Sequence, residues 1–212
     1  MRSPIAREGW PIIIFFTLIA LLSRILYKGL GKFFLFLVGF SLYFFRDPER
    51  QIPNGKDSVV SPADGTIVDI SEGFEGLYIK EDCIKVSIFL SLFDVHINRS
   101  PLEGVIEFVK YVPGLFLTAF DPKASFKNEQ NIIGIKTENG KILVKQIAGI
   151  IARRIIFKKN IGEKVEKGER VGMIRFGSRT DIMLAKSQIK ELKVEVGDRV
   201  SGGNSILALR ML

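Results

Sequence analysis

The chain has 212 residues, a net charge of +8 and an apolar fraction of 47%, which exclude a disordered chain and fit one domain, or one domain with an appendage. Its single cysteine excludes a disulfide-bonded scaffold and a cysteine-based zinc site, and its single histidine, His96, excludes histidine-rich metal motifs. We therefore expect no metal site, and any imidazole chemistry must use His96.

The N-terminal part is strongly apolar. Residues 9–23 and 33–45 carry no charge, and the stretch between them holds Arg24, Lys28 and Lys32. Each run is shorter than the roughly 20 residues of a spanning helix. We predict a hydrophobic helical hairpin within residues 1–48 that is held at a membrane. It either crosses the bilayer at a tilt or dips in without crossing, and a hairpin buried in the core is the alternative.

From residue 49 onward the pattern changes to short segments of period two, separated by turn residues such as Asp64-Gly65 and Glu138-Asn139-Gly140. The predicted strands are Ser58–Ile70, Ile84–Leu92, Val105–Tyr111, Ile132–Thr137, Ile142–Ile147 and Ile189–Val196. Residues 121–130 are predicted to hold a turn or a short helix. The second predicted domain, residues 49–212, is therefore mainly β, a sheet-rich barrel or sandwich.

A weak internal repeat supports this fold class. Gly-Glu-Lys-Val at 162–165 recurs as Gly-Asp-Arg-Val at 197–200, each followed by a further glycine. This strand–turn–strand pattern is similar to the hairpin units of biotinyl/lipoyl-type barrel-sandwich domains, and it carries no chemistry by itself.

Two segments could carry chemistry on residue type alone. Asp64 lies in a tight turn, Ser-Pro-Ala-Asp-Gly, where an aspartate can simply close the turn. His96 ends an apolar strand and is flanked by Asp94, Asn98 and Arg99, polar neighbours that favour a functional histidine over a structural one.

Two further segments admit two interpretations each. Arg153 and Arg154 lie within an apolar stretch and either bind an anionic group or form a solvated edge. Gly177-Ser178 lacks the second glycine of a hydrolase nucleophile elbow, so a plain turn is the alternative to a reactive serine.

Six segments together carry a family resemblance. They are FRDPER (45–50), SPADG (61–65), DVHINRSP (94–101), FDPKASFKNEQN (120–131), QIAGIIARRI (146–155) and GMIRFGSR (172–179). In this order and spacing the chain resembles the short, membrane-associated form of phosphatidylserine decarboxylase, from about residue 4 to residue 212.

The resemblance implies a chain that makes its own cofactor. The Ser178 hydroxyl attacks the Gly177 carbonyl, β-elimination cuts the chain, and Ser178 becomes an N-terminal pyruvoyl group. The expected products are a β chain of residues 1–177 and an α chain of residues 178–212, which stay together as a heterodimer whose further oligomerisation is left open. No metal and no nucleic acid partner are implied.

The resemblance also implies the reaction. The pyruvoyl carbonyl forms a Schiff base with the amine of phosphatidylserine and acts as an electron sink as CO2 leaves, which yields phosphatidylethanolamine. The enzyme is expected at the cell membrane, with its catalytic domain on the cytoplasmic side.

The residues expected to act are Ser178, His96 and Asp64, the last of which polarises a histidine in the family. Longer members carry a second histidine at the position of Arg99. An arginine is no base at neutral pH, so Arg99, with Arg153 and Arg154, is expected to bind a substrate carboxylate or phosphate. Whether His96 serves cleavage, decarboxylation or both is left open.

Three other functions compete with this one. An archaetidylserine decarboxylase would use the same residues on an ether lipid. A membrane-anchored barrel-sandwich carrier or adaptor would share the hairpin and the repeat, and a serine hydrolase would keep Ser178 intact. Only a self-processing enzyme yields two chains on a denaturing gel.

Overall fold

The computed structural model describes residues 3–26, 28–115, 127–149, 154–175 and 177–211. The chain divides into two compact units, Met1–Glu49 and Arg50–Leu212, which we call the helical unit and the β unit. The predicted turn or short helix at residues 121–130 falls largely outside the described residues.

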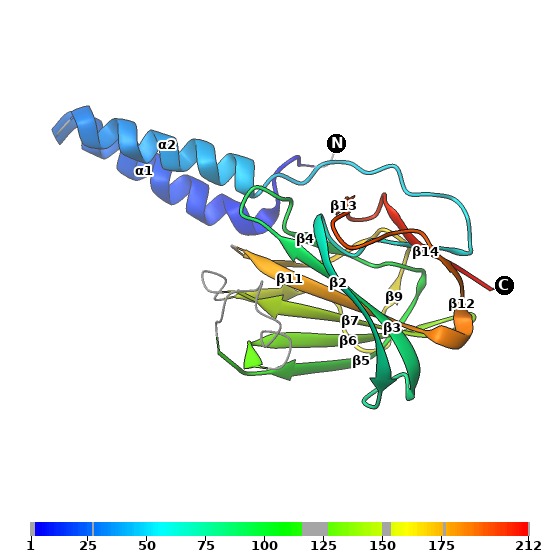
Figure 1. Ribbon diagram of the computed structural model, residues 1–212. Helices are drawn as coiled ribbons and strands as arrows, with labels where there is room; N and C mark the ends of the chain where they lie inside the picture. The colour runs from blue at the N-terminus through cyan, green and yellow to red at the C-terminus, as the bar shows by residue number, and fades with distance from the viewer. Residues whose placement is uncertain (1–2, 27, 116–126, 150–153, 176, 212) are drawn as a thin grey trace. The chain divides into compact units, whose positions relative to one another are not determined.

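The helical unit holds a short 3-10 helix, Arg7–Gly9, followed by α1, Trp10–Leu26, and α2, Lys28–Phe44. The two long helices pack side by side, with the rings of Phe16 and Phe34 6.3 Å apart (Figure 1). Both helices extend beyond the uncharged runs, because a basic residue at a helix end can direct its charge to solvent.

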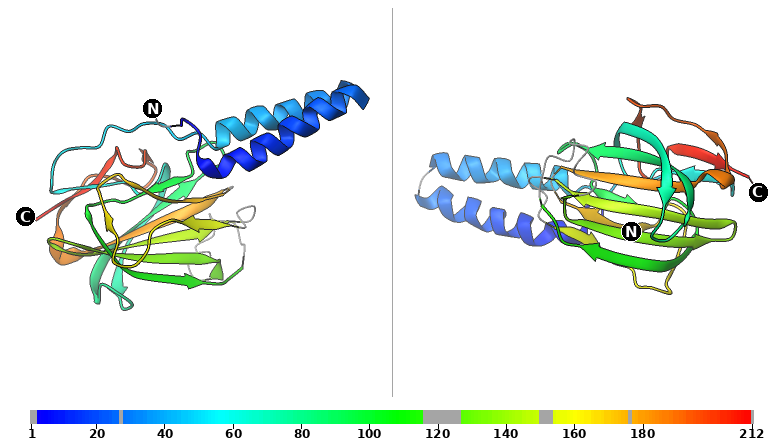
Figure 2. Two further views of the ribbon diagram at one scale, coloured as in Figure 1. Left: turned by 180° about the vertical axis from the view of Figure 1, so that it is seen from behind. Right: turned by 60° about the horizontal axis from the view of Figure 1, so that its bottom comes forward.

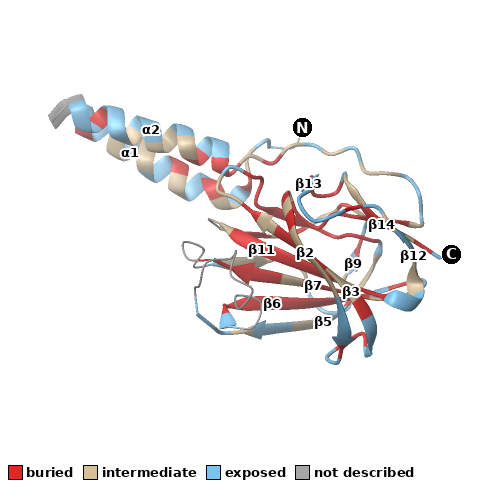
Figure 3. Ribbon diagram, viewed as in Figure 1, coloured by how far each residue is buried: buried red, intermediate tan, exposed pale blue. Residues whose placement is uncertain are grey.

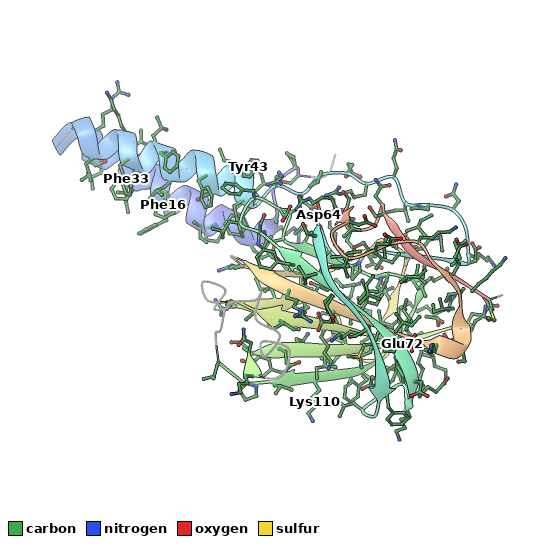
Figure 4. All side chains as sticks on the ribbon, in the orientation of Figure 1. Phe16, Phe33, Tyr43, Asp64, Glu72 and Lys110 are labelled. Atoms are coloured by element: carbon green, nitrogen blue, oxygen red, sulfur yellow. The ribbon has the colours of Figure 1, made fainter. Side chains whose placement is uncertain are left out.

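The outer faces of both helices are apolar, and Figure 3 shows that most of their surface is exposed or half-buried. The large apolar side chains that are at least half exposed are Ile14, Phe15, Leu18, Leu21, Leu22, Phe33, Leu35 and Phe36. Figure 4 labels Phe16 and Phe33 along this pair of helices. Over the residues that the structure describes, neither helix is long and apolar enough to cross a membrane.

The β unit confirms the prediction of a mainly β chain. Its strands are β1 Ser58–Val60, β2 Gly65–Glu75, β3 Glu81–Leu90, β4 Ile97–Arg99, β5 Gly104–Val112, β6 Gln130–Thr137, β7 Gly140–Ala148, β8 Ile155–Phe157, β9 Lys164–Val165, β10 Arg170–Ile174, β11 Ser178–Ala185, β12 Ile189–Leu192, β13 Arg199–Val200 and β14 Ile206–Arg210. A 3-10 turn, η2, spans Lys186–Gln188.

These strands form one large sheet and two small ones. The eight-stranded sheet has the order β13-β2-β3-β11-β7-β6-β5-β9, and the small sheets have the orders β1-β14-β12 and β4-β10-β8. All the described strand pairs are antiparallel. Figure 2 shows the long strands of the large sheet curling around the interior. Strand β11 is central, since it pairs with β3 on one side and β7 on the other.

One predicted strand is divided in two. The segment Ser58–Ile70 forms β1 and β2 with a turn at residues 61–64 between them. Ser61 Oγ closes this turn by donating to the Ala63 carbonyl at 2.6 Å, and Pro62 has no amide with which to continue a ladder. The turn brings Asp64 to the beginning of β2, far from Glu72 near the other end of the strand (Figure 4).

The internal repeat forms the two edges of the large sheet. Gly162 and Gly197, with φ of +87° and +102°, precede the edge strands β9 and β13. Their amides donate to Ile106 and Ile67 in β5 and β2, both at 2.8 Å.

The repeat is longer than the glycine pattern suggests. Ser-Pro-Ala-Asp-Gly before β2 has a counterpart, Ser-Pro-Leu-Glu-Gly, at residues 100–104 before β5. Each serine hydroxyl bonds the carbonyl two residues on, and each serine carbonyl accepts from a glycine amide of the repeat, Gly203 or Gly168, at 2.8 Å. The β unit is therefore built on an internal pseudo-symmetry in which Glu103 occupies the place of Asp64.

Candidate active site

Gly177 and Ser178 lie where the chain enters the central strand. Gly177 has φ +65°, the left-handed region that favours glycine. A Cβ added there would meet no described atom within 4 Å, so backbone conformation and not lack of space requires a glycine. Ser178 begins β11, with Leu90 and Ala148 as its neighbours in register. Its side chain is fully buried, and its Oγ has no hydrogen-bond partner among the described residues.

His96 is the side chain that meets this junction. It lies directly before β4, is fully buried, and its Nε2 accepts a hydrogen bond of 3.2 Å from the Gly177 amide. Its Nδ1 lies 2.9 Å from the main-chain carbonyl oxygen of Asp94, to which it donates. That bond places the proton of the neutral ring on Nδ1, so Nε2 offers a lone pair at the Gly177–Ser178 junction.

Asp94 holds the segment that carries His96. Its Oδ2 accepts from the Ser91 amide at 2.8 Å and from the Ser91 hydroxyl at 2.7 Å, while its Oδ1 pairs with Arg199 at 2.5 Å. Burial alone would raise the pKa of Asp94, but the hydrogen bonds from Arg199 and Ser91 outweigh it and hold the pKa below its usual value. The sequence places Asp94 beside His96 but does not show that its backbone fixes the ring.

Asp64 makes two polar contacts at the beginning of β2. Its Oδ2 pairs with Arg50 at 2.7 Å and its Oδ1 accepts from the Gly202 amide at 2.7 Å. Burial raises the pKa of Asp64, and the attraction of Arg50 and the Gly202 hydrogen bond offset this only in part. The structure therefore brings His96 to Gly177, whereas the side chain of Asp64 contacts Arg50 and the Gly202 amide, and its polarising role stays a prediction.

The three arginines expected to bind substrate differ in their surroundings. Arg99 is buried, and its Nη1 donates to the Gly168 carbonyl at 2.9 Å. Arg154 is exposed, and its carbonyl accepts a hydrogen bond of 3.3 Å from the Arg175 amide, two residues before Gly177. Arg153 lies outside the described residues. Substrate binding by these residues stays a prediction.

A buried chain of hydrogen bonds links the strands that carry His96 and Ser178. Asn98 Nδ2 donates to Thr180 Oγ1 at 3.0 Å, and Gln146 Nε2 donates to Asn98 Oδ1 at 2.8 Å. Asn131 Nδ2 then donates to Gln146 Oε1 at 3.1 Å. We call these four residues the amide network, and all are at most 5% exposed.

The amide network connects the segments that carry His96 and Ser178. Asn98 follows His96 by two residues, and Thr180 follows Ser178 by two on the same face of β11. The network therefore ties β4, in one sheet, to β11 in another. Asn98 is one of the polar neighbours that favour a functional His96. Thr180 and Gln146 are not singled out by residue type, although Thr180 lies two residues after Ser178 and Gln146 begins the motif at residues 146–155.

The surroundings of Ser178 fit the group that the resemblance implies. A pyruvoyl group made from Ser178 needs a serine with an uncommitted hydroxyl next to a peptide that can adopt an unusual conformation, and both are present. Among the described residues, no three or more His, Cys, Asp or Glu side chains gather as a metal-binding group.

A buried serine directly after a left-handed glycine, with a histidine at the junction, is the arrangement expected of a precursor that cuts its own chain. Comparison with known proteins gives the family. The sequence model described as phosphatidylserine decarboxylase matches residues 37–208, and the chain belongs to the phosphatidylserine decarboxylase family. Proteins of this family depend on a pyruvoyl group and associate with membranes.

Individual relatives match over nearly the whole chain. The phosphatidylserine decarboxylase proenzyme of Carboxydothermus hydrogenoformans is 43% identical over 209 residues, which cover 98% of each chain. The protein of the same name from Symbiobacterium thermophilum is 43% identical, over 98% of this chain and 96% of its own. That of Amoebophilus asiaticus is 47% identical over 168 residues, 79% of this chain and 74% of its own.

Proposed function

We propose that this protein is a self-processing decarboxylase that converts phosphatidylserine to phosphatidylethanolamine and CO2. The observation that carries the proposal is the fully buried Ser178, which follows Gly177 at φ +65° beside His96 and whose hydroxyl has no hydrogen-bond partner among the described residues. The names of the relatives support phosphatidylserine over an archaeal ether lipid, and family membership favours a lyase over a carrier protein or a hydrolase.

Cleavage begins at the Gly177–Ser178 peptide bond. The Oγ of Ser178 attacks the carbonyl carbon of Gly177, the C–O bond forms, the C–N bond breaks, and the hydroxyl proton passes to the amide nitrogen. The resulting ester is then split by β-elimination. The α-proton of Ser178 leaves, the bond from Cβ to oxygen breaks, and Gly177 departs as a carboxylate. Tautomerisation and hydrolysis consume one water, release ammonia and leave a pyruvoyl group on residue 178.

His96 is the base that these steps require. Its Nε2 carries the lone pair, because Nδ1 donates to the Asp94 carbonyl. In the precursor, Nε2 accepts from the Gly177 amide, while Ser178 Oγ has no partner among the described residues. Proton transfer therefore requires Nε2 to exchange the Gly177 amide for the hydroxyl of the next residue. A rotation about the Ser178 side chain and a small shift of the Gly177 backbone would achieve this.

After cleavage, the new group would lie at the beginning of β11, where residue 178 is in register with Leu90 and Ala148. Residue 178 has then lost its amide nitrogen, so the pairing of β11 from Arg179 onward would hold the group in place. There the pyruvoyl carbonyl supplies an electron sink for the carbanion left by departing CO2. His96 remains beside it to hold or return a proton, and Arg154 offers a cation for the anionic headgroup. The apolar face of the helical unit is proposed to hold the enzyme at the cell membrane, with the β unit on the cytoplasmic side.

The test is the size of the chain after expression. The native protein should yield two chains, residues 1–177 and 178–212, on a denaturing gel and by intact mass, whereas Ser178→Ala should stay a single chain of 23.8 kDa. Ser187→Ala, which removes an exposed hydroxyl from η2, is the matched control and should process normally. Two chains cut after residue 177 in Ser178→Ala would refute the assignment of the nucleophile.

A further inference from the structure

A second polar site lies at the end of the β unit away from Ser178. It is a groove of about 600 Å³, lined by Asn54, Lys56, Leu102, Glu103, Gly104, Val105, Lys136, Thr137, Glu138, Lys167 and Arg210. Strand β7 leads from the turn beside this groove, at Gly140, to Ala148 beside Ser178. Eight residues of extended strand span about 25 Å. The groove is therefore separate from the candidate active site.

Arg210 is the most deeply buried cation of the groove. Only 6% of its surface is exposed. Its Nη1 donates to Thr137 Oγ1 at 2.9 Å, but its buried Nε has no hydrogen-bond partner among the described residues. Among those residues it also makes no ion pair within 4.0 Å. Burial lowers the pKa of Arg210, and the attraction of Glu138 offsets this only in part. A buried guanidinium with an unused donor is costly unless an acceptor completes it.

Lys167 provides a second cation in the same groove. Its Nζ donates to the Gly55 carbonyl and to Ser58 Oγ, at 2.5 and 3.0 Å, and makes no ion pair among the described residues. Burial lowers the pKa of Lys167, and repulsion from Arg210 lowers it further despite the attraction of Asp57. Two cations that repel each other thus line one groove, and no carboxylate among the described residues is bound to either.

The internal pseudo-symmetry shows that the two halves of the repeat differ in their charged neighbours. Glu103, at the rim of the groove, occupies the place that Asp64 has in the other half of the repeat. Asp64 is paired with Arg50 at 2.7 Å. Lys136 contacts Glu107 at 3.6 Å, outside the groove. The groove itself holds four cationic side chains against two carboxylates, Glu103 and Glu138.

We propose that this groove binds a phosphate group, held between Arg210 and Lys167. A phosphate carries up to two negative charges and several acceptor oxygens, so one group can pair with both cations. A carboxylate offers one charge. The group belongs either to free phosphate or to a lipid headgroup that ends in a phosphomonoester. Because Arg210 follows Ser178 in the chain and Lys167 precedes it, the ligand would bind both products of cleavage at once.

The first experiment is calorimetric titration of the processed full-length protein with inorganic phosphate at constant ionic strength. Lys167→Gln and Arg210→Lys should each weaken phosphate binding by about tenfold or more, the effect of one charge-assisted hydrogen bond. Arg210→Lys keeps the charge but removes the Nε donor. Lys190→Gln, at an exposed position on β12, is the control for overall charge and should bind phosphate like the native protein.

The second experiment identifies the source of the phosphate. Sedimentation with phosphatidylcholine vesicles, with and without phosphatidic acid, compares the native protein with Lys167→Gln. A preference for phosphatidic acid that Lys167→Gln loses assigns a lipid headgroup, and variant-sensitive titration without that preference assigns free phosphate. Equal titration and equal sedimentation for the native protein and both variants would overturn the proposal. Chain cleavage and melting temperature report folding, and Lys167→Gln carries the test if Arg210→Lys does not fold.

Discussion

His96 and Gly177 are 81 positions apart in the chain, and the Nε2 of one accepts a hydrogen bond of 3.2 Å from the amide of the other. This contact joins the small sheet that contains β4 to the beginning of the central strand of the large sheet. The chain's single imidazole therefore meets the one Gly-Ser bond that the family resemblance marks for cleavage.

Replacement of His96 tests whether this contact is chemical or only structural. His96→Ala should slow cleavage by about 10²–10⁴-fold, the usual effect of losing a general base. Cleavage rate and melting temperature are measured together on purified precursor. A core histidine would lower the melting temperature and leave cleavage of the folded fraction at the native rate, which would remove His96 from this step.

Asn98 is predicted to position the reacting groups without touching them. Asn98→Ala leaves buried partners on Gln146 and Thr180 unsatisfied, which costs about 2–4 kcal/mol of stability. It also loosens the link between β4 and β11, so cleavage should slow about 10- to 100-fold.

The control for Asn98 lies at the other end of the amide network. Asn131→Ala removes only the bond to Gln146 Oε1 and should cost about 1–3 kcal/mol while cleavage stays near the native rate. If both variants slowed cleavage in proportion to their loss of stability, the network would be structural only.

The stability of the β unit should depend on pH through Asp94. The pKa of Asp94 in the folded protein lies below its ordinary value of 3.8, so the folded state favours the ionised form. Its contribution is fully present above about pH 4 and is lost as the pH falls through the lowered pKa. Asp94→Asn should therefore lower the free energy of unfolding by about 1 kcal/mol at pH 7.

Below pH 4 the native protein and Asp94→Asn should converge in melting temperature. Asp82→Asn, at an exposed position on β3, is the control and should follow the native curve at every pH. A constant difference between Asp94→Asn and the native protein from pH 7 to pH 3 would contradict this account.

Membrane attachment through the helical unit should resist salt. The exposed side chains of α1 and α2 are large and apolar, and burial of such surface contributes about 25 cal/mol per Å² at any ionic strength. Attraction of basic residues to headgroups is screened at 1 M salt. The protein should stay with membranes in 1 M NaCl and leave them in detergent. Complete release by salt alone would exclude apolar attachment.

Local sequence patterns predicted much of this fold, but they did not predict the contacts between residues that are far apart in the chain. The period-two segments give the long strands, and the cluster of motifs gives Gly177, Ser178 and His96. The ion pair between Asp64 and Arg50 is harder to predict from the sequence, because Arg50 lies outside the turn that contains Asp64. Gln146 and Thr180 are 48 and 82 positions from Asn98, so only the folded sheets bring them together. The repeat of Ser-Pro-x-acid-Gly can be seen in the sequence, but its structural role is clear only once the two edge strands of the large sheet are known.

The central place of β11 has a consequence for the cut chain. Self-cleavage before Ser178 would leave β11, β12, β13 and β14 on one fragment and the flanking strands β3 and β7 on the other. The fragments could separate only if a middle strand were withdrawn from between two neighbours, with both ladders broken together. The cleaved protein would thus resemble two complementary fragments that had folded together before the bond between them was cut. For a synthetic peptide of residues 178–212, the position of β11 between β3 and β7 in the remaining sheet would be vacant. Strand complementation fills a vacancy of this kind.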